Sequence, residues 1–146
     1  MSSMTIFTPS TSEEVLSVVQ GALSEEEPLE IVGHGTKRGI GRPVQAAHAL
    51  YLSGLSGVTL YEPEELVLSA KAGTPLVDIE KLLDDNRQQL AFEPMDYGPL
   101  FGVEPGRGTI GGVLASNTSG PRRLKAGAAR DHILGIHAVS GRGEAF

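Results

Sequence analysis

The hydrophobic and polar positions of the first part of the chain follow a helical period and then an extended one. Apolar residues recur at helical spacing over residues 12–24, behind Ser12 as a capping residue and an acidic first turn. Residues 29–32 (LEIV) form a short apolar run after Pro28, which is typical of a buried strand. The pattern therefore predicts a helix over 12–24 and a strand over 29–32.

Three more strands and a second helix are predicted in the middle of the chain. Residues 47–52 and 58–61 are apolar runs separated by turn residues, and residues 66–72 alternate between apolar and polar positions. The period then becomes helical, with Thr74 as a candidate cap and a proline at the first helical position. We expect this helix to extend over residues 75–86.

The last part of the chain is rich in glycine and proline. Residues 92–108 lack periodicity and are predicted to form a loop, whereas residues 133–139 are predicted to form the last strand. Residues 141–143 (GRG) would turn that strand into a hairpin whose second strand is only beginning at residue 146. The pattern predicts a fragment with an unpaired sheet edge, and hence self-association near its C-terminus.

Two glycine-rich segments carry the candidate chemistry. The first, GHGTKRGIG at residues 33–41, follows the predicted strand directly, and the second, at residues 106–123, alternates glycine with small hydroxyl residues. Small side chains leave backbone N–H groups accessible to phosphate oxygens. The first segment has neither the P-loop pattern nor the usual GxGxxG pattern of a dinucleotide fold. Together the two segments predict one phosphate-bearing ligand, although a surface turn without a ligand remains an alternative for the first.

The charged residues are unevenly distributed. Residues 1–97 carry 15 acidic and 6 basic residues, whereas residues 98–146 carry 3 acidic and 6 basic residues. The formal net charge of −6 argues against a general nucleic-acid binder, and the basic residues Arg122, Arg123 and Lys125 lack interleaved aromatic side chains. An anionic ligand would find its counter-charge in the second part of the chain.

The sequence supplies no candidate for a metal centre or a catalytic base. It contains no cysteine, which excludes disulfides and thiolate ligands and fits a reducing cytoplasm, and its four histidines are scattered. His34 is interpreted as a loop residue because no carboxylate stands at a defined spacing from it. We therefore assign no catalytic residue and no metal ligand.

Four further motifs accompany the glycine segments in a fixed order: GRPV at 41–44, AGTPLVDIEKLL at 72–83, GPRR at 120–123 and RDHILG at 130–135. With them the chain resembles the FAD-binding domain of the vanillyl-alcohol oxidase / p-cresol methylhydroxylase type, and is most similar to the FAD-binding subunits of bacterial glycolate oxidases. The resemblance implies an α+β fold with two subdomains. We assign a small parallel βαβ-like unit to residues 1–55 and a mainly antiparallel, truncated unit to residues 56–146.

The resemblance also implies which residues contact FAD. The loop whose backbone amides hold the pyrophosphate corresponds to Gly33, His34, Gly35, Thr36 and Lys37. The other implied cofactor contacts are Thr109, Gly111, Gly112, Ser116, Gly120, Asp131 and Ile136. Some relatives attach the flavin through a histidine at the position of Thr36, so the cofactor is expected to bind non-covalently here.

The activity implied by the resemblance is the oxidation of a 2-hydroxy acid such as glycolate. The implied partners are the other glycolate oxidase subunits, a flavoprotein and an iron–sulfur protein. The implied location is the cytoplasm, with attachment to a membrane through these partners as an alternative. The fragment alone is expected to be inactive. The family loop commonly has the sequence GGGTS, from which His34, Lys37 and Arg38 depart. The alternative is therefore a structural or interaction subunit that keeps the fold without useful flavin binding.

Overall fold

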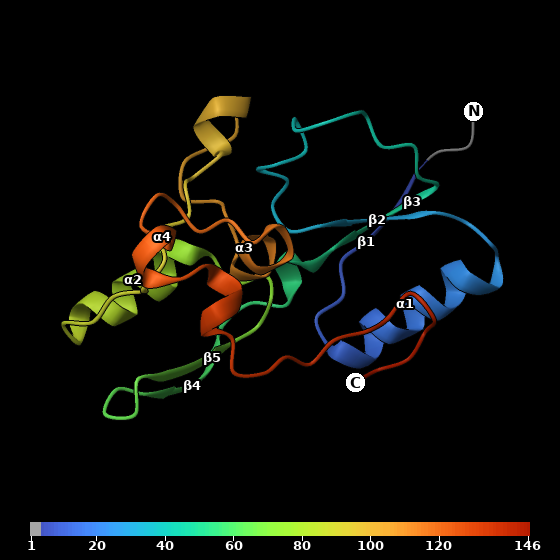
Figure 1. Ribbon diagram of the computed structural model, residues 1–146. Helices are drawn as coiled ribbons and strands as arrows, with labels where there is room; N and C mark the ends of the chain where they lie inside the picture. The colour runs from blue at the N-terminus through green and yellow to red at the C-terminus, as the bar shows by residue number, and fades with distance from the viewer. Residues whose placement is uncertain (1–3) are drawn as a thin grey trace.

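The computed structural model describes residues 4–146, which form two separate sheets (Figure 1). Strands β1 (Thr5–Phe7), β2 (Leu29–Val32) and β3 (His48–Tyr51) make a parallel sheet in the order β1-β3-β2. Strands β4 (Val58–Glu62) and β5 (Val67–Ala70) make an antiparallel hairpin. This arrangement confirms the predicted α+β class with one parallel and one antiparallel part.

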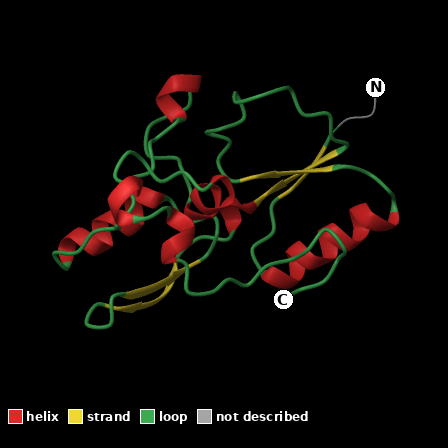
Figure 2. Ribbon diagram, viewed as in Figure 1, coloured by secondary structure: helices red, strands yellow, loops and turns green. Residues whose placement is uncertain are grey.

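Helices and long loops make up much of the remaining chain (Figure 2). The helices are α1 (Ser12–Ser24), α2 (Leu76–Asp85), α3 (Ile110–Ser116) and α4 (Arg123–Ala126). Short 3₁₀ turns lie at Leu52–Gly54, Gly98–Phe101 and Ala129–His132. In Figure 1, α1 lies beside the parallel sheet, whereas α2, α4 and the β4–β5 hairpin lie at the other end of the molecule.

Helix α1 is the crossover that connects the parallel strands β1 and β2, between which β3 is inserted. Its cap is Thr11, one residue before the predicted cap Ser12: the Thr11 hydroxyl accepts a hydrogen bond from the N–H of Glu14 at 3.2 Å, while the Glu14 carboxylate accepts from the N–H of Thr11 at 3.3 Å. This reciprocal pair satisfies two N–H groups that the helix would otherwise leave free. In this unit, Ala49 and Leu50 of β3 are completely or almost completely buried.

A second core joins segments that lie far apart in the sequence. It contains Leu76 of α2, Phe92 of the following loop, Val113 of α3 and Ala129 of the last 3₁₀ turn. Burial of these apolar side chains fixes α3 against α2 and the 129–132 turn. The position of α3 thus depends on non-local packing.

Thr74 connects the hairpin to α2 and does not cap the helix as predicted. Its hydroxyl accepts from the N–H of Gly57 at 2.9 Å and lies 2.6 Å from the carbonyl oxygen of Lys71, to which it donates. The N-cap position of α2 is Pro75, one residue later. The side chain of Thr74 is 2% exposed, so these bonds form away from water.

We expect Thr74→Val to lower the free energy of unfolding by about 1 to 3 kcal/mol, because the substitution leaves the buried N–H of Gly57 without its acceptor. Thr59→Val is a suitable control, since Thr59 is exposed and donates one 3.3 Å bond to Ser69. Urea unfolding followed by circular dichroism measures both variants. Equal losses in the two variants would contradict the role given to Thr74.

Residues 133–139 do not form the predicted strand. Within residues 4–146 no neighbouring strand pairs with this segment except at Val139, which makes an isolated bridge with Ala145. The predicted turn at Gly141–Gly143 is present, and Ala138 and Phe146 exchange two backbone hydrogen bonds of 2.8 and 3.0 Å. This small hairpin contacts α1, where Gln20 donates to the carbonyl oxygen of Gly143 at 3.0 Å. A β-strand is stable only when it pairs with another strand. The side-chain pattern of residues 133–139 does not supply such a partner.

No helix in the described part of the chain is long and apolar enough to cross a membrane.

Candidate functional site

The two glycine-rich segments meet at the carboxyl end of β2. A Cβ atom built on Gly33 would lie 2.7 Å from Oγ1 of Thr109, so the Thr109 side chain packs against the backbone of Gly33 more closely than a side chain there would permit. The ring of His34 lies on the same side, with Nδ1 2.9 Å from the carbonyl oxygen of Arg107. The loop after β2 and the start of α3 therefore form one continuous surface.

The loop 33–37 leaves its backbone donors free. Gly35 adopts a left-handed conformation with φ +76°. Within residues 4–146, no protein acceptor takes the N–H groups of His34, Gly35, Thr36 and Lys37. A turn with a left-handed residue and successive free N–H groups is the backbone arrangement that binds anions. The loop therefore suits a phosphate group.

Arg38 does not add its charge to this loop. Its guanidinium forms a two-point contact with the Glu30 carboxylate, at 2.9 Å from Nε and 2.7 Å from Nη2, and donates to the hydroxyl of Tyr51 at 3.3 Å. Glu30 lies on β2 and Tyr51 on β3, so Arg38 anchors the end of the loop to the parallel sheet. Its charge is largely neutralised by this pair.

Lys37 points toward the start of α3. Its Nζ lies 3.7 Å from the position that a Cβ on Gly112 would take, and 5.4 Å from the ring centroid of Tyr97. Burial lowers the pKa of Lys37, and the nearby Asp96 carboxylate partly opposes this effect. Lys37 is thus half-buried, with its ammonium group near the start of α3 and the Tyr97 ring.

The first turn of α3 has no free N–H groups to offer a ligand. The N–H of Ile110 donates to Thr74, that of Gly111 to Ala72, and those of Gly112 and Val113 to Oγ1 and the carbonyl oxygen of the capping residue Thr109. A Cβ on Gly111 would lie 2.7 Å from the carbonyl oxygen of Ala72, so glycine is required there for close packing. Gly111 and Gly112 adjoin the loop, and their contact with a cofactor stays a prediction.

The family model described as "FAD binding domain" matches residues 4–146. The chain belongs to this family of FAD-binding domains. The match covers both glycine-rich segments and the two sheets, and it confirms the family that the sequence motifs indicate.

Curated relatives of this FAD-binding domain are oxidoreductases by name. The glycolate oxidase subunit GlcE of Escherichia coli is 38% identical over 133 residues, which cover 91% of this chain and 36% of that protein. A D-lactate dehydrogenase of Archaeoglobus fulgidus is 30% identical over 139 residues, covering 90% of this chain and 28% of that protein. The domain therefore spans about a third of the length of these relatives.

The fold has a clear counterpart among solved structures. An alkyldihydroxyacetonephosphate synthase superposes with a TM-score of 0.76 at 21% sequence identity, over 94% of this chain and 25% of that one. At this identity the likeness concerns the fold alone.

The remaining predicted contacts of the FAD-binding domain lie apart from the loop 33–37. Ser116 donates to the carbonyl oxygen of Gly112 at 2.6 Å, Gly120 (φ +70°) packs against Glu93, and Asp131 accepts from the N–H of Ala128 at 2.8 Å. Ile136 is 60% exposed and lies outside any strand. The hydroxyl of Ser116 and the carboxylate of Asp131 therefore already have local structural partners. Their contact with FAD stays a prediction.

The sequence pattern did not indicate Asp96 and Tyr97, which lie near the side chain of Lys37. Asp96 accepts hydrogen bonds from the N–H groups of Gly98 (3.0 Å) and Gly106 (2.7 Å), which folds the 96–107 loop onto itself. The loop contacts the glycine segment, since a Cβ on Gly39 would fall on the ring of Phe101. The signal was the acid Asp96 and the aromatic residues Tyr97 and Phe101 within the aperiodic segment 92–108.

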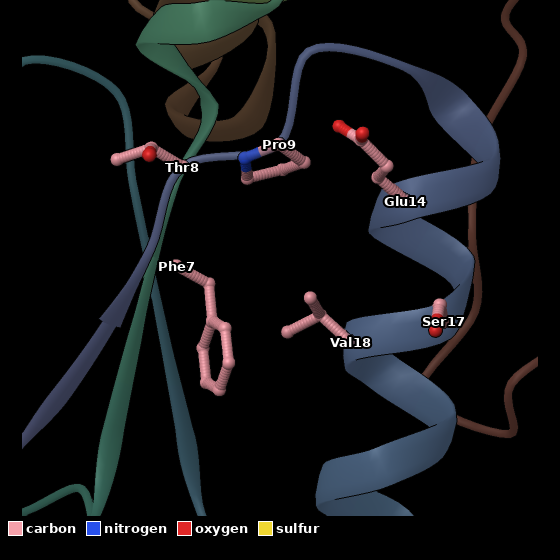
Figure 3. A pocket seen from close by; sticks show the side chains of 6 residues that line it. All are labelled: Phe7, Thr8, Pro9, Glu14, Ser17 and Val18. Carbon is pink, nitrogen blue, oxygen red and sulfur yellow. The ribbon is translucent and has the colours of Figure 1, made fainter.

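Two other features of the domain lie away from this site. Glu27 and Glu25 place carboxylate oxygens 2.6 and 3.8 Å from Nε2 of His48, which ties the end of α1 to β3. A groove of about 340 Å³ lies between the end of β1 and α1, lined by Phe7, Thr8, Pro9, Glu14, Ser17 and Val18 (Figure 3). The Glu14 carboxylate in this groove is already engaged in the cap of α1. Neither feature contains a predicted cofactor contact.

Proposed function

We propose that this domain binds FAD non-covalently, with the diphosphate on the loop 33–37, as part of a flavin-dependent 2-hydroxy-acid oxidoreductase. The observation that carries the proposal is the run of four free N–H groups from His34 to Lys37, in a loop whose own lysine is directed toward the second glycine segment at Gly112. Anions bind where successive amides and a positive charge converge. Thr36 stands where a covalently attaching histidine would be needed, and its side chain is 6% exposed.

The substrate class follows from the shared chemistry of the relatives. Glycolate, D-lactate and D-2-hydroxyglutarate appear in the names of three of them, and all are 2-hydroxy carboxylates. The flavin supplies hydride acceptance when bound, while the protein binds and orients it. Our proposal gives this domain the binding role within a glycolate oxidase or a related dehydrogenase.

The chain on its own is proposed to be inactive toward substrate. In the described residues, the one histidine of the loop, His34, already contacts the carbonyl oxygen of Arg107 at 2.9 Å. Our proposal assigns no general base to the loop 33–37. The name of the Escherichia coli relative describes a subunit, which supports a complex with other oxidase subunits, and we propose a flavoprotein and an iron–sulfur protein as these partners.

Titration of the 146-residue chain with FAD tests the proposal directly. We expect quenched flavin fluorescence and a raised melting temperature, with a stabilisation of about 2.7 kcal/mol at a ligand concentration a hundred times the Kd. ADP should compete because it carries the diphosphate, and FMN should bind more weakly because it lacks the adenylate half. An absence of any response at high micromolar FAD would contradict the proposal and favour an interaction subunit.

A further inference from the structure

We infer that the side chain of Lys37, positioned by Tyr97 and Asp96 of the 96–107 loop, supplies the positive charge that holds the diphosphate. The inference rests on the proposed function and gives a role to a loop that the family motifs do not include. It assigns Lys37 a contact through its ammonium group in addition to its backbone. Tyr97 and Asp96 are positioning residues that act through Lys37.

The other groups that could give a positive potential at the loop 33–37 are either paired within the protein or exposed to solvent. Arg38 forms its two-point contact with Glu30 and faces the sheet. The N–H groups of the first turn of α3 all have acceptors within the protein. Arg107 is exposed, so its charge is screened by solvent. Lys37 belongs to the loop itself, is half-buried, and places its ammonium group near Gly112 and the Tyr97 ring.

The 96–107 loop holds Lys37 in place before any ligand arrives. Its fold depends on the two hydrogen bonds of the Asp96 carboxylate with Gly98 and Gly106, neither of which involves Lys37. The Tyr97 ring then lies 5.4 Å from Nζ of Lys37, within the range of a cation–π contact. A side chain held in its binding geometry loses less entropy when the ligand binds.

Burial of Lys37 makes its charge sensitive to an anion. Desolvation lowers the pKa of Lys37 in the free protein. A bound diphosphate stabilises the ammonium form and so raises this pKa, which means that binding takes up a proton at pH values between the free and the bound pKa. The contribution of Lys37 to diphosphate affinity is therefore constant at pH values below the pKa of Lys37 in the free protein. It falls as the pH rises above that pKa.

Equilibrium binding of ADP by variants of the full chain tests the inference. ADP is the probe because its phosphate ionises fully above about pH 8, given a second pKa of about 6. We expect Lys37→Met to bind ADP about tenfold to a hundredfold more weakly, and Lys37→Arg to recover part of the loss. Tyr97→Leu should bind about two- to fivefold more weakly, whereas Tyr97→Phe keeps the ring and the affinity. Arg107→Gln is the matched control for loss of an exposed cation.

The pH profile separates a charge effect from a merely structural one. Wild-type affinity for ADP should fall as the pH rises through the lowered pKa of Lys37, and the Lys37→Met profile should be flatter. Equal ADP affinity and parallel pH profiles in wild type and Lys37→Met would overturn the inference while leaving the proposed function intact. Failure of the wild type to bind either FAD or ADP would instead overturn the proposed function. A weakened Lys37→Met with an unchanged Tyr97→Leu would overturn the positioning role of the 96–107 loop.

Discussion

Replacement of Gly120 by alanine should lower the free energy of unfolding by about 2 to 5 kcal/mol. Gly120 has φ +70°, a conformation that side chains with a Cβ rarely adopt, and the added Cβ would fall on the carbonyl oxygen of Glu93. The Glu93 backbone is not free to retreat, because its N–H donates to the carbonyl oxygen of Ser119 at 2.9 Å. Chemical unfolding followed by circular dichroism measures the loss.

Gly102→Ala is the matched control for this substitution. Gly102 has φ +72°, but a Cβ built on it meets nothing within 4 Å. Gly102→Ala should therefore lower the free energy of unfolding only by the cost of the left-handed backbone, about 1 to 2 kcal/mol. If both variants lost the same free energy, the close approach of Gly120 to Glu93 would contribute nothing to stability.

Elements with strong local signals were predicted well. The helix over 12–24 and the strand over 29–32 have the predicted bounds, because the apolar period and the flanking acidic and proline residues act within a few positions of the chain. The loop predicted over 92–108 is also aperiodic apart from one 3₁₀ turn at Gly98–Phe101. Local chemistry was sufficient in these segments.

Elements that depend on distant residues were missed or misplaced. Helix α3 begins with two consecutive glycines after Ile110, which is a poor helical sequence, and it forms because Thr109 caps it and Val113 is buried in the second core. The strand predicted over 133–139 is absent because nothing in residues 4–146 pairs with most of it. Strand β1 is three residues long and was not predicted, since its pairing with β3 is the main evidence for it.

The candidate site was partly foreseen from its glycines and basic residues. The pattern located the loop 33–37 and the second segment near Thr109, which the structure brings together. It did not show that Arg38 is paired with Glu30 and Tyr51, because those contacts depend on the alignment of β2 and β3. The subdomain boundary at residue 55 and the cytoplasmic location stay predictions.

Replacement of Gly35 by valine should weaken FAD binding by about 10- to 100-fold, which corresponds to about 1.4 to 2.8 kcal/mol. Gly35 has φ +76°, and a β-branched residue there must either accept strain or move the backbone. Movement would turn away the free N–H groups that face the diphosphate in our proposal. A Cβ at this position would also approach Cδ of Arg38 to 3.2 Å and press on the pair that anchors the loop. Gly41→Val is the matched control, because Gly41 also has a left-handed φ of +82°, has open space around it and lies outside the loop 33–37. Fluorescence titration gives the affinities and circular dichroism shows that both variants fold; if Gly35→Val bound FAD as tightly as Gly41→Val, the loop 33–37 would be a turn without a role in cofactor binding.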